Sequence, residues 1–157
     1  MNVSELNRTD NGAELSCPSA RCEVGAVLLG IVGADGVVGY VTPRMTVDRD
    51  FVRKACAGRT PETRFRFAQP CIKGRCKRWT GSDCGLITKI LDSPEASNRG
   101  ASMSGSLPKC VIRSSCRWFA QGGVRACAVC PLIIHSQDNS VSPASTALPT
   151  VAKTKLQ

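Results

Sequence analysis

Ten cysteines are the residues of this 157-residue chain whose type and spacing best suit chemistry. Thiolates are soft ligands that bind zinc and iron–sulfur clusters, and paired thiols can also form disulfides. All of the cysteines except Cys56 fall into short groups along the sequence. The grouped cysteines are Cys17, Cys22, Cys71, Cys76, Cys84, Cys110, Cys116, Cys127 and Cys130.

The densest group lies between residues 110 and 130. Five residues separate Cys110 from Cys116, ten more precede Cys127, and two separate Cys127 from Cys130. Four thiolates close in sequence are the number that one cubane cluster or one tetrahedral metal ion requires. We therefore predict a [4Fe–4S] site here, with zinc as the alternative.

An earlier group supplies three cysteines of a second predicted site. Four residues separate Cys71 from Cys76, and seven more precede Cys84. The fourth ligand must come from elsewhere in the chain, and Cys17 and Cys22 are the alternatives. A β-hairpin after Cys22 could return the chain toward Cys71.

Proline follows a cysteine in both regions, at Cys17-Pro18 and Cys130-Pro131. The segment from Cys127 to Pro131 resembles the end of the ligand run in bacterial ferredoxins, where a cysteine precedes proline. The two- and five-residue gaps are also similar to those of the WhiB-like regulators, in the opposite order. These resemblances cover the ligand segment alone, and they imply iron–sulfur binding with electron transfer as the leading role.

The two groups also look like a diverged internal repeat. One begins Cys71-Ile-Lys-Gly-Arg-Cys76 and reaches Trp79; the other begins Cys110-Val-Ile-Arg-Ser-Ser-Cys116 and reaches Trp118. Each contains cysteine, an aliphatic residue, a basic residue, cysteine, a basic residue and tryptophan. We expect the two tryptophans to pack in the core, and the alternative is that they shield a cluster from water.

Composition favours metal ligation over disulfides. Residues 1–16 are polar and lack the apolar segment of a secretory signal, so we expect a cytoplasmic, reducing location. Aromatic residues make up only 4% of the chain, and a core with few large side chains usually needs covalent or metal staples. Residues 24–41 are mostly apolar, but five glycines and Asp35 favour a hairpin over a membrane span.

The pattern predicts a small, Cys-rich α+β protein. We expect a β-hairpin from strands 24–32 and 37–42, with Pro43 closing the second strand. A short helix over 47–57 should follow, capped by Thr46 or Asp48 and ended by Gly58, with Cys56 as a small buried hydrophobe on its apolar face. Alternation at 64–67 predicts a half-buried strand.

The predicted organisation places the two cysteine modules on either side of a linker. Residues 1–15 form a flexible arm, 16–92 the α+β module with the first site, and 93–108 a Ser/Gly-rich linker. Residues 109–135 form the second Cys module, and 136–157 a disordered tail.

The formal net charge of +9 indicates the kind of partner. Two clusters with their thiolates would lower it only to about +5. An acidic redox partner or a larger enzyme is therefore expected. Nucleic acid is the alternative partner, because basic residues surround three aromatic rings. These residues are Arg64, Arg66, Lys73, Arg75, Lys77 and Arg78, with Phe65, Phe67 and Trp79.

Little in the sequence favours enzymatic catalysis. The single histidine, His135, supplies no catalytic triad, and the glycine spacing at residues 30–36 does not match a dinucleotide fingerprint. The leading hypothesis is an electron carrier with one or two [4Fe–4S] clusters. The alternatives are a zinc- or cluster-braced regulatory protein that binds nucleic acid, and an accessory subunit whose clusters are structural.

Overall fold

The computed structural model describes residues 14–102 and 105–134. Most of the predicted arm (1–15), the predicted tail (136–157) and His135 lie outside these ranges. Within them the chain is a small α+β protein, as predicted, with one antiparallel sheet in the strand order β1-β4-β2-β3. The strands are β1 (Ser16–Ala20), β2 (Val27–Val32), β3 (Val38–Thr46) and β4 (Phe65–Pro70).

Strands β2 and β3 form the predicted hairpin. In the turn, the Gly36 N–H donates to the Gly33 carbonyl at 3.0 Å, and the Gly33 N–H donates to the Val37 carbonyl at 2.8 Å. Gly36 has φ +76°, a conformation that residues with a Cβ rarely adopt. The turn residues Gly33 and Gly36, which the sequence pattern identified, therefore determine how β2 pairs with β3.

The prediction that Pro43 ends the second strand was wrong, because β3 continues to Thr46. Leu28 pairs with Met45 while Gly30 pairs with Tyr40, so the intervening residues of β3 bulge out of the ladder. A bulge removes the need for an N–H at proline, which is how the strand tolerates it.

Helix α1 (Arg49–Cys56) confirms the predicted helix and one of its two predicted caps. The side chain of Asp48 accepts a hydrogen bond from the Phe51 N–H at 2.7 Å. The expectation that Cys56 is buried was wrong: Ala55 is buried, but Cys56 is exposed. Cys56 is the last residue of the helix, one position beyond the buried Ala55, and its side chain faces solvent.

Strand β4 differs from the half-buried strand that alternation predicted. It lies between β1 and β2, and Arg66 is 3% exposed while Phe67 is fully buried. Because β4 is an inner strand covered on both faces, the charged side chain at Arg66 lies in the interior. The consequences of this burial appear at the functional site.

Three further helices are α2 (Gly85–Leu91), α3 (Pro94–Ser102) and α4 (Arg117–Val129). Helix α3 covers residues 94–102 of the segment 93–108 that was expected to be a linker. The Ala96 N–H donates to the Ser93 hydroxyl at 3.3 Å, and Pro94 opens the helix. Serine before an N-terminal proline is a helix start signal that the linker interpretation overlooked.

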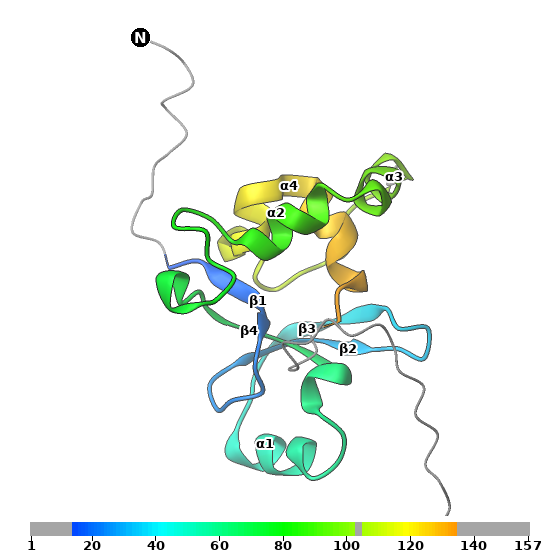
Figure 1. Ribbon diagram of the computed structural model, residues 1–157. Coiled ribbons are helices and arrows are strands. Elements are labelled where there is room, and N and C mark those ends of the chain that lie inside the picture. Colours follow the sequence, from blue (N-terminus) through cyan, green and yellow to red (C-terminus); the bar gives the residue numbers. More distant parts are fainter. Residues whose placement is uncertain (1–13, 103–104, 135–157) are drawn as a thin grey trace, which may run out of the picture.

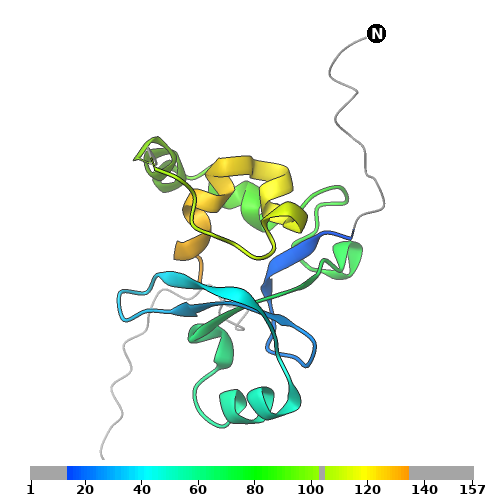
Figure 2. The same cartoon turned by 180° about the vertical axis from the view of Figure 1, so that it is seen from behind.

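The elements form three layers, with α2, α3 and α4 on one side of the sheet and α1 on the other (Figures 1 and 2). Successive residues of β2 point to opposite faces. Val27 and Leu29 join the core beneath α2–α4, whereas Leu28 joins the core beneath α1. No helix within the described ranges combines the length and apolar character that crossing a bilayer requires.

Replacing Asp48 by alanine is expected to lower the free energy of unfolding by about 1 kcal/mol, because the Phe51 N–H loses its acceptor. Asp48→Ser should stay within a few tenths of the parent value, because serine caps equally well. Denaturant unfolding measures both variants. Equal losses in the two would contradict the capping role.

Candidate functional site

Cys17 is the cysteine that joins the first group. Strands β1 and β4 pair so that Cys17 lies opposite Gln69, and the Cys71 N–H donates to the Leu15 carbonyl at 2.7 Å. Burial raises the pKa of the Cys17 thiol to about 11, and the nearby Cys84, Cys71 and Cys76 raise it further, while the Ser19 N–H opposes this. Cys17 is therefore close enough to Cys71, Cys76 and Cys84 for their charges to affect it, which favours Cys17 over Cys22 as the predicted fourth member of this group.

Short chain reversals gather the other three members of this group. The 3₁₀ turn Lys73–Arg75 lies between Cys71 and Cys76, and the Cys76 N–H donates to the Lys73 carbonyl at 2.8 Å. An antiparallel bridge then pairs Trp79 with Cys84. Helix α2 begins directly after Cys84, so its positive N-terminal end lies at the group.

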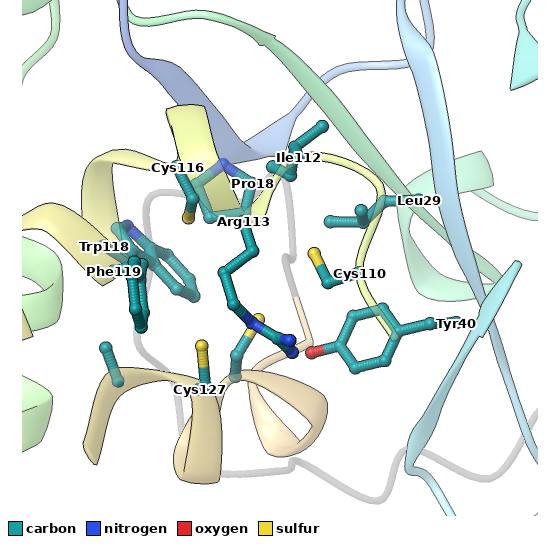
Figure 3. A pocket seen from close by; sticks show the side chains of 12 residues that line it. Pro18, Leu29, Tyr40, Cys110, Ile112, Arg113, Cys116, Trp118, Phe119 and Cys127 are labelled. Carbon is teal, nitrogen blue, oxygen red and sulfur yellow. The ribbon is translucent and has the colours of Figure 1, made fainter. Parts of the chain in front are cut away.

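The second group surrounds a cavity between the sheet and α4 (Figure 3). Cys110, Cys116, Cys127 and Cys130 all line this cavity of about 20 Å³. The remaining lining residues are Pro18, Leu29, Tyr40, Ile112, Arg113, Trp118, Phe119 and Ala126. The four cysteines predicted to act together thus share one enclosed, largely apolar site.

A kink in α4 brings the last two of these cysteines to the cavity. Gly123 has φ +57° and ψ −140°, which divides the helix. The first part begins after Cys116, and the second part carries Cys127 and leads to Cys130. Gly122, beside the kink, packs on α2 so closely that a Cβ there would lie 2.5 Å from Leu91 Cδ1. The positive φ of Gly123 therefore favours glycine at the kink, and a side chain at Gly122 would require the Leu91 side chain to shift.

Arg66 places a buried positive charge against the second group. Its guanidinium donates to Cys130 Sγ at 3.4 Å and to the Cys130 carbonyl at 3.1 Å, and it lies 5.9 Å from the centre of the Trp118 ring. No carboxylate pairs with Arg66 among the residues that the structure describes. A buried guanidinium needs an anionic partner, and the Cys130 sulfur is the acceptor in reach.

Tyr40 is a second donor to Cys130. Its hydroxyl points into the cavity (Figure 3). A side-chain hydrogen bond joins Tyr40 to Cys130. Burial raises the pKa of the Cys130 thiol, while Arg66 and Tyr40 lower it. Burial also raises the pKa of Cys116 to about 12, against the opposing N–H groups of Phe119 and Trp118. The apolar walls thus resist isolated thiolates, and the polar groups favour negative charge on sulfur.

Several buried N–H donors around this cavity have no acceptor. In the described part of the chain, Arg113 Nε, Arg117 Nε and Trp118 Nε1 are buried without a hydrogen-bond partner. Arg113 and Trp118 line the cavity, and Arg117 follows Cys116 in sequence. An unpaired buried donor costs about 1–3 kcal/mol, so the two donors on residues that line the cavity, Arg113 Nε and Trp118 Nε1, favour an acceptor there.

The two groups are neighbours in space. Ser16, the residue before Cys17, forms a parallel bridge with Cys116, and Pro18 lines the second cavity. The Arg117 guanidinium lies 5.2 Å from the centre of the Trp79 ring. A single strand segment therefore connects the two groups.

Gln121 of α4 fixes the position of Cys84. Its Oε1 accepts the Cys84 N–H at 2.8 Å, and its Nε2 donates to the Cys84 carbonyl at 3.3 Å. The first group is thereby attached to the helix that begins at the second. Neither Gln121 nor the Gly122-Gly123 pair was recognised from the sequence, although adjacent glycines inside a helical segment are a signal for a kink.

The predicted repeat is matched by local structure up to its second cysteine. The turn Lys73–Arg75 precedes Cys76, and the 3₁₀ turn Arg113–Ser115 precedes Cys116. Beyond that point the segments differ. Trp79 lies in a loop and is half-buried, whereas Trp118 begins α4 and is 1% exposed.

Two of the sequence-based interpretations change here. Cys22 lies beside Cys56, away from the first group. Arg66 and Phe67 are buried, so they cannot contact nucleic acid as part of the basic, aromatic surface proposed above, although Lys73, Arg75, Lys77 and Arg78 are exposed. Within the described ranges, no three His, Cys, Asp or Glu side chains form a group that could hold a single metal ion.

Comparisons of this chain with protein-family models, with curated proteins and with solved structures found no match.

Replacing Gln121 by leucine is expected to lower the free energy of unfolding by about 1–2 kcal/mol, because the Cys84 N–H loses its partner. Gln69→Leu is the control, since its bond to Glu23 is exposed, and it should change stability by less than about 0.5 kcal/mol. Denaturant titration under anaerobic conditions compares them. Similar values for both would contradict a docking role for Gln121.

Proposed function

We propose that each group of four cysteines binds a [4Fe–4S] cluster and that the protein transfers electrons between the two clusters and a partner. The observation that carries this proposal is the buried Arg66 guanidinium against Cys130, with no carboxylate paired to it in the described ranges. A cluster with its thiolates carries net negative charge and would neutralise Arg66 at the second group.

The unpaired donors favour a cluster over a zinc ion at the second group. A zinc ion bound by four thiolates brings no acceptor atoms beyond the four cysteine sulfurs. The inorganic sulfides of a cluster are additional acceptors, and Trp118 Nε1 and Arg113 Nε are buried donors at the cavity without partners. The donor set therefore suits a group that offers more sulfur than the cysteines alone.

A bound [4Fe–4S] cluster supplies a one-electron redox couple, and the surrounding residues set its environment. Trp118, Phe119 and Leu29 line the cavity with apolar surface and exclude water. Arg66 and Tyr40 donate to the Cys130 sulfur, which stabilises added negative charge and should raise the reduction potential. The second site is thus the more enclosed and the more strongly hydrogen-bonded one.

The neighbouring positions of the two groups support exchange of electrons between them. Ser16 bridges Cys116 and directly precedes Cys17, so bonded backbone leads from one group to the other. The stacked pair of Arg117 and Trp79 provides a second contact. Two redox centres this close would pass electrons to each other along one transfer path.

The exposed basic residues around the first group suggest where a partner docks. Cys17, Cys71, Cys76 and Cys84 are each partly accessible, whereas Cys116 and Cys130 are buried. Lys73, Arg75, Lys77 and Arg78 are exposed beside the first group. An acidic redox protein would complement this surface, and electrons would enter or leave at the first group.

Protein prepared without oxygen is expected to contain iron and acid-labile sulfide in amounts that match two clusters. Cys76→Ser and Cys116→Ser should each lose about half of both, because each removes one ligand of a different site. Cys56→Ser is the matched control and should keep the full content. Zinc in place of iron, or loss of all iron from either variant, would overturn the proposal of two independent clusters.

A second comparison tests the membership of the first group. Cys17→Ser should lower the iron content as much as Cys76→Ser does, because β1 pairing brings Cys17 to that group. Cys22→Ser should retain the parent content and the parent visible absorption. The reverse pattern would show that Cys22 is the fourth ligand.

A further inference from the structure

Two of the ten cysteines belong to neither group: Cys22 packs in one core cluster with Ala55, the residue before Cys56, and a side-chain hydrogen bond joins Cys22 to Cys56. Cys22 follows β1, and Cys56 is the last residue of α1. Burial raises the pKa of the Cys22 thiol to about 11, and the charge of Cys56, the charge of Glu62 and a side-chain hydrogen bond with Cys56 add to this. Cys22 also belongs to the core cluster beneath α1 that contains Ala55. The fold therefore assembles a pair of free thiols.

The two thiols differ in accessibility. Cys56 is exposed, whereas Cys22 is only 8% exposed. In thiol–disulfide exchange, one accessible thiolate attacks the incoming disulfide, and a second thiol then attacks the mixed disulfide. The exposed Cys56 suits the first role, and the buried Cys22 suits the second.

A buried carboxyl group adjoins Cys22. Glu62, in the 3₁₀ turn Pro61–Thr63, is 3% exposed, and its Oε1 accepts the Cys22 N–H at 2.7 Å. Its Oε2 is buried and has no hydrogen-bond partner among the described residues. A carboxylate oxygen left unpaired in this position can accept the proton that Cys22 must lose.

Arg64 supplies positive charge near the same thiols. Its guanidinium donates to the backbone carbonyls of Ala55 and Arg59 at the end of α1, the latter at 3.0 Å. The charge of Arg64 also opposes the rise in the pKa of Cys22. A cation held by backbone carbonyls beside two sulfurs stabilises the thiolate that exchange requires.

We infer that Cys22 and Cys56 form a thiol–disulfide exchange site for low-molecular-weight disulfides, with Glu62 as its proton acceptor. The Cys56 thiolate attacks one sulfur of the substrate disulfide, which forms a mixed disulfide and releases one thiolate that takes up a proton. Cys22 then loses its proton to Glu62 and attacks the Cys56 sulfur. An internal disulfide forms, and the second substrate thiol leaves. The protein thereby loses two electrons and two protons, and the substrate gains both.

This site is separate from the two groups of four cysteines. It lies with α1, on the face of the sheet opposite α2 and α4 (Figure 2). None of its residues lines the cavity of the second group. Exchange at this pair can therefore be tested without regard to what the other cysteines bind.

The test uses oxidised glutathione with the full chain prepared without oxygen. Trypsin cleaves after Arg and Lys, so it places Cys22 in the peptide 22–44 and Cys56 in the peptide 55–59, and neither contains another cysteine. After acid quenching and alkylation, mass spectrometry should find these two peptides joined, with two glutathiones released per chain. Because the readout belongs to two defined peptides, it succeeds or fails independently of the iron content.

Three variants assign the roles. Cys22→Ser should stop at Cys56 carrying one glutathione, and Cys56→Ser should leave the peptide 22–44 unmodified, because Cys22 is shielded. Glu62→Gln, which keeps an acceptor for the Cys22 N–H, should slow closure of the internal disulfide about tenfold or more while glutathione adds to Cys56 at the parent rate. Absence of the joined peptides in the parent, modification of Cys22 in Cys56→Ser, or unchanged closure in Glu62→Gln would overturn the inference.

Discussion

The buried guanidinium of Arg66 imposes an electrostatic constraint on much of the described fold. It is 3% exposed on an inner strand, and moving an isolated ion into an apolar interior costs more than a small domain can offset. Cys130 supplies the sulfur and the carbonyl that accept its hydrogen bonds, and Trp118 supplies the ring beneath it. The Arg66 charge therefore contacts three parts of the fold at once. These are the end of α4, the centre of the sheet and the second cysteine group.

The sheet separates two sets of cysteines. Residues of β2 alternate between a core beneath α2–α4, which contains Cys116 and Cys130, and a core beneath α1, which contains Cys22. The buried polar atoms without partners in the described part of the chain follow the same division. Arg113 Nε and Trp118 Nε1 belong to residues that line the second cavity, and Arg117 Nε belongs to the guanidinium over Trp79. Glu62 Oε2 and Arg64 Nε lie near Cys22. Unpaired buried polar atoms lower the stability of a fold, so each set of them indicates a place where the fold keeps polar groups for another reason.

Local features were predictable from sequence, and features that depend on strand order were not. The hairpin turn and the Asp48 cap follow from residues close in sequence. The position of Cys17 near Cys71 depends on β1 pairing with β4, and the burial of Arg66 depends on β4 lying between β1 and β2. Spacing placed Cys110, Cys116, Cys127 and Cys130 in one group, and all four line one cavity, but only the kink at Gly123 explains how a helix returns the last two to it. Cys56 was misjudged because an apolar helical face does not indicate where the face ends.

The bridge between Ser16 and Cys116 has a consequence for biosynthesis. All cysteines of the first group precede residue 85, so they are translated before any cysteine of the second group. Strands β1 and β4 end by Pro70, so both can leave the ribosome and pair before translation of the second group is complete. The later segment then adds to a surface that β1 presents at Ser16 and Pro18. Vectorial synthesis thus lets the amino-terminal half act as the template on which the carboxy-terminal thiols are arranged.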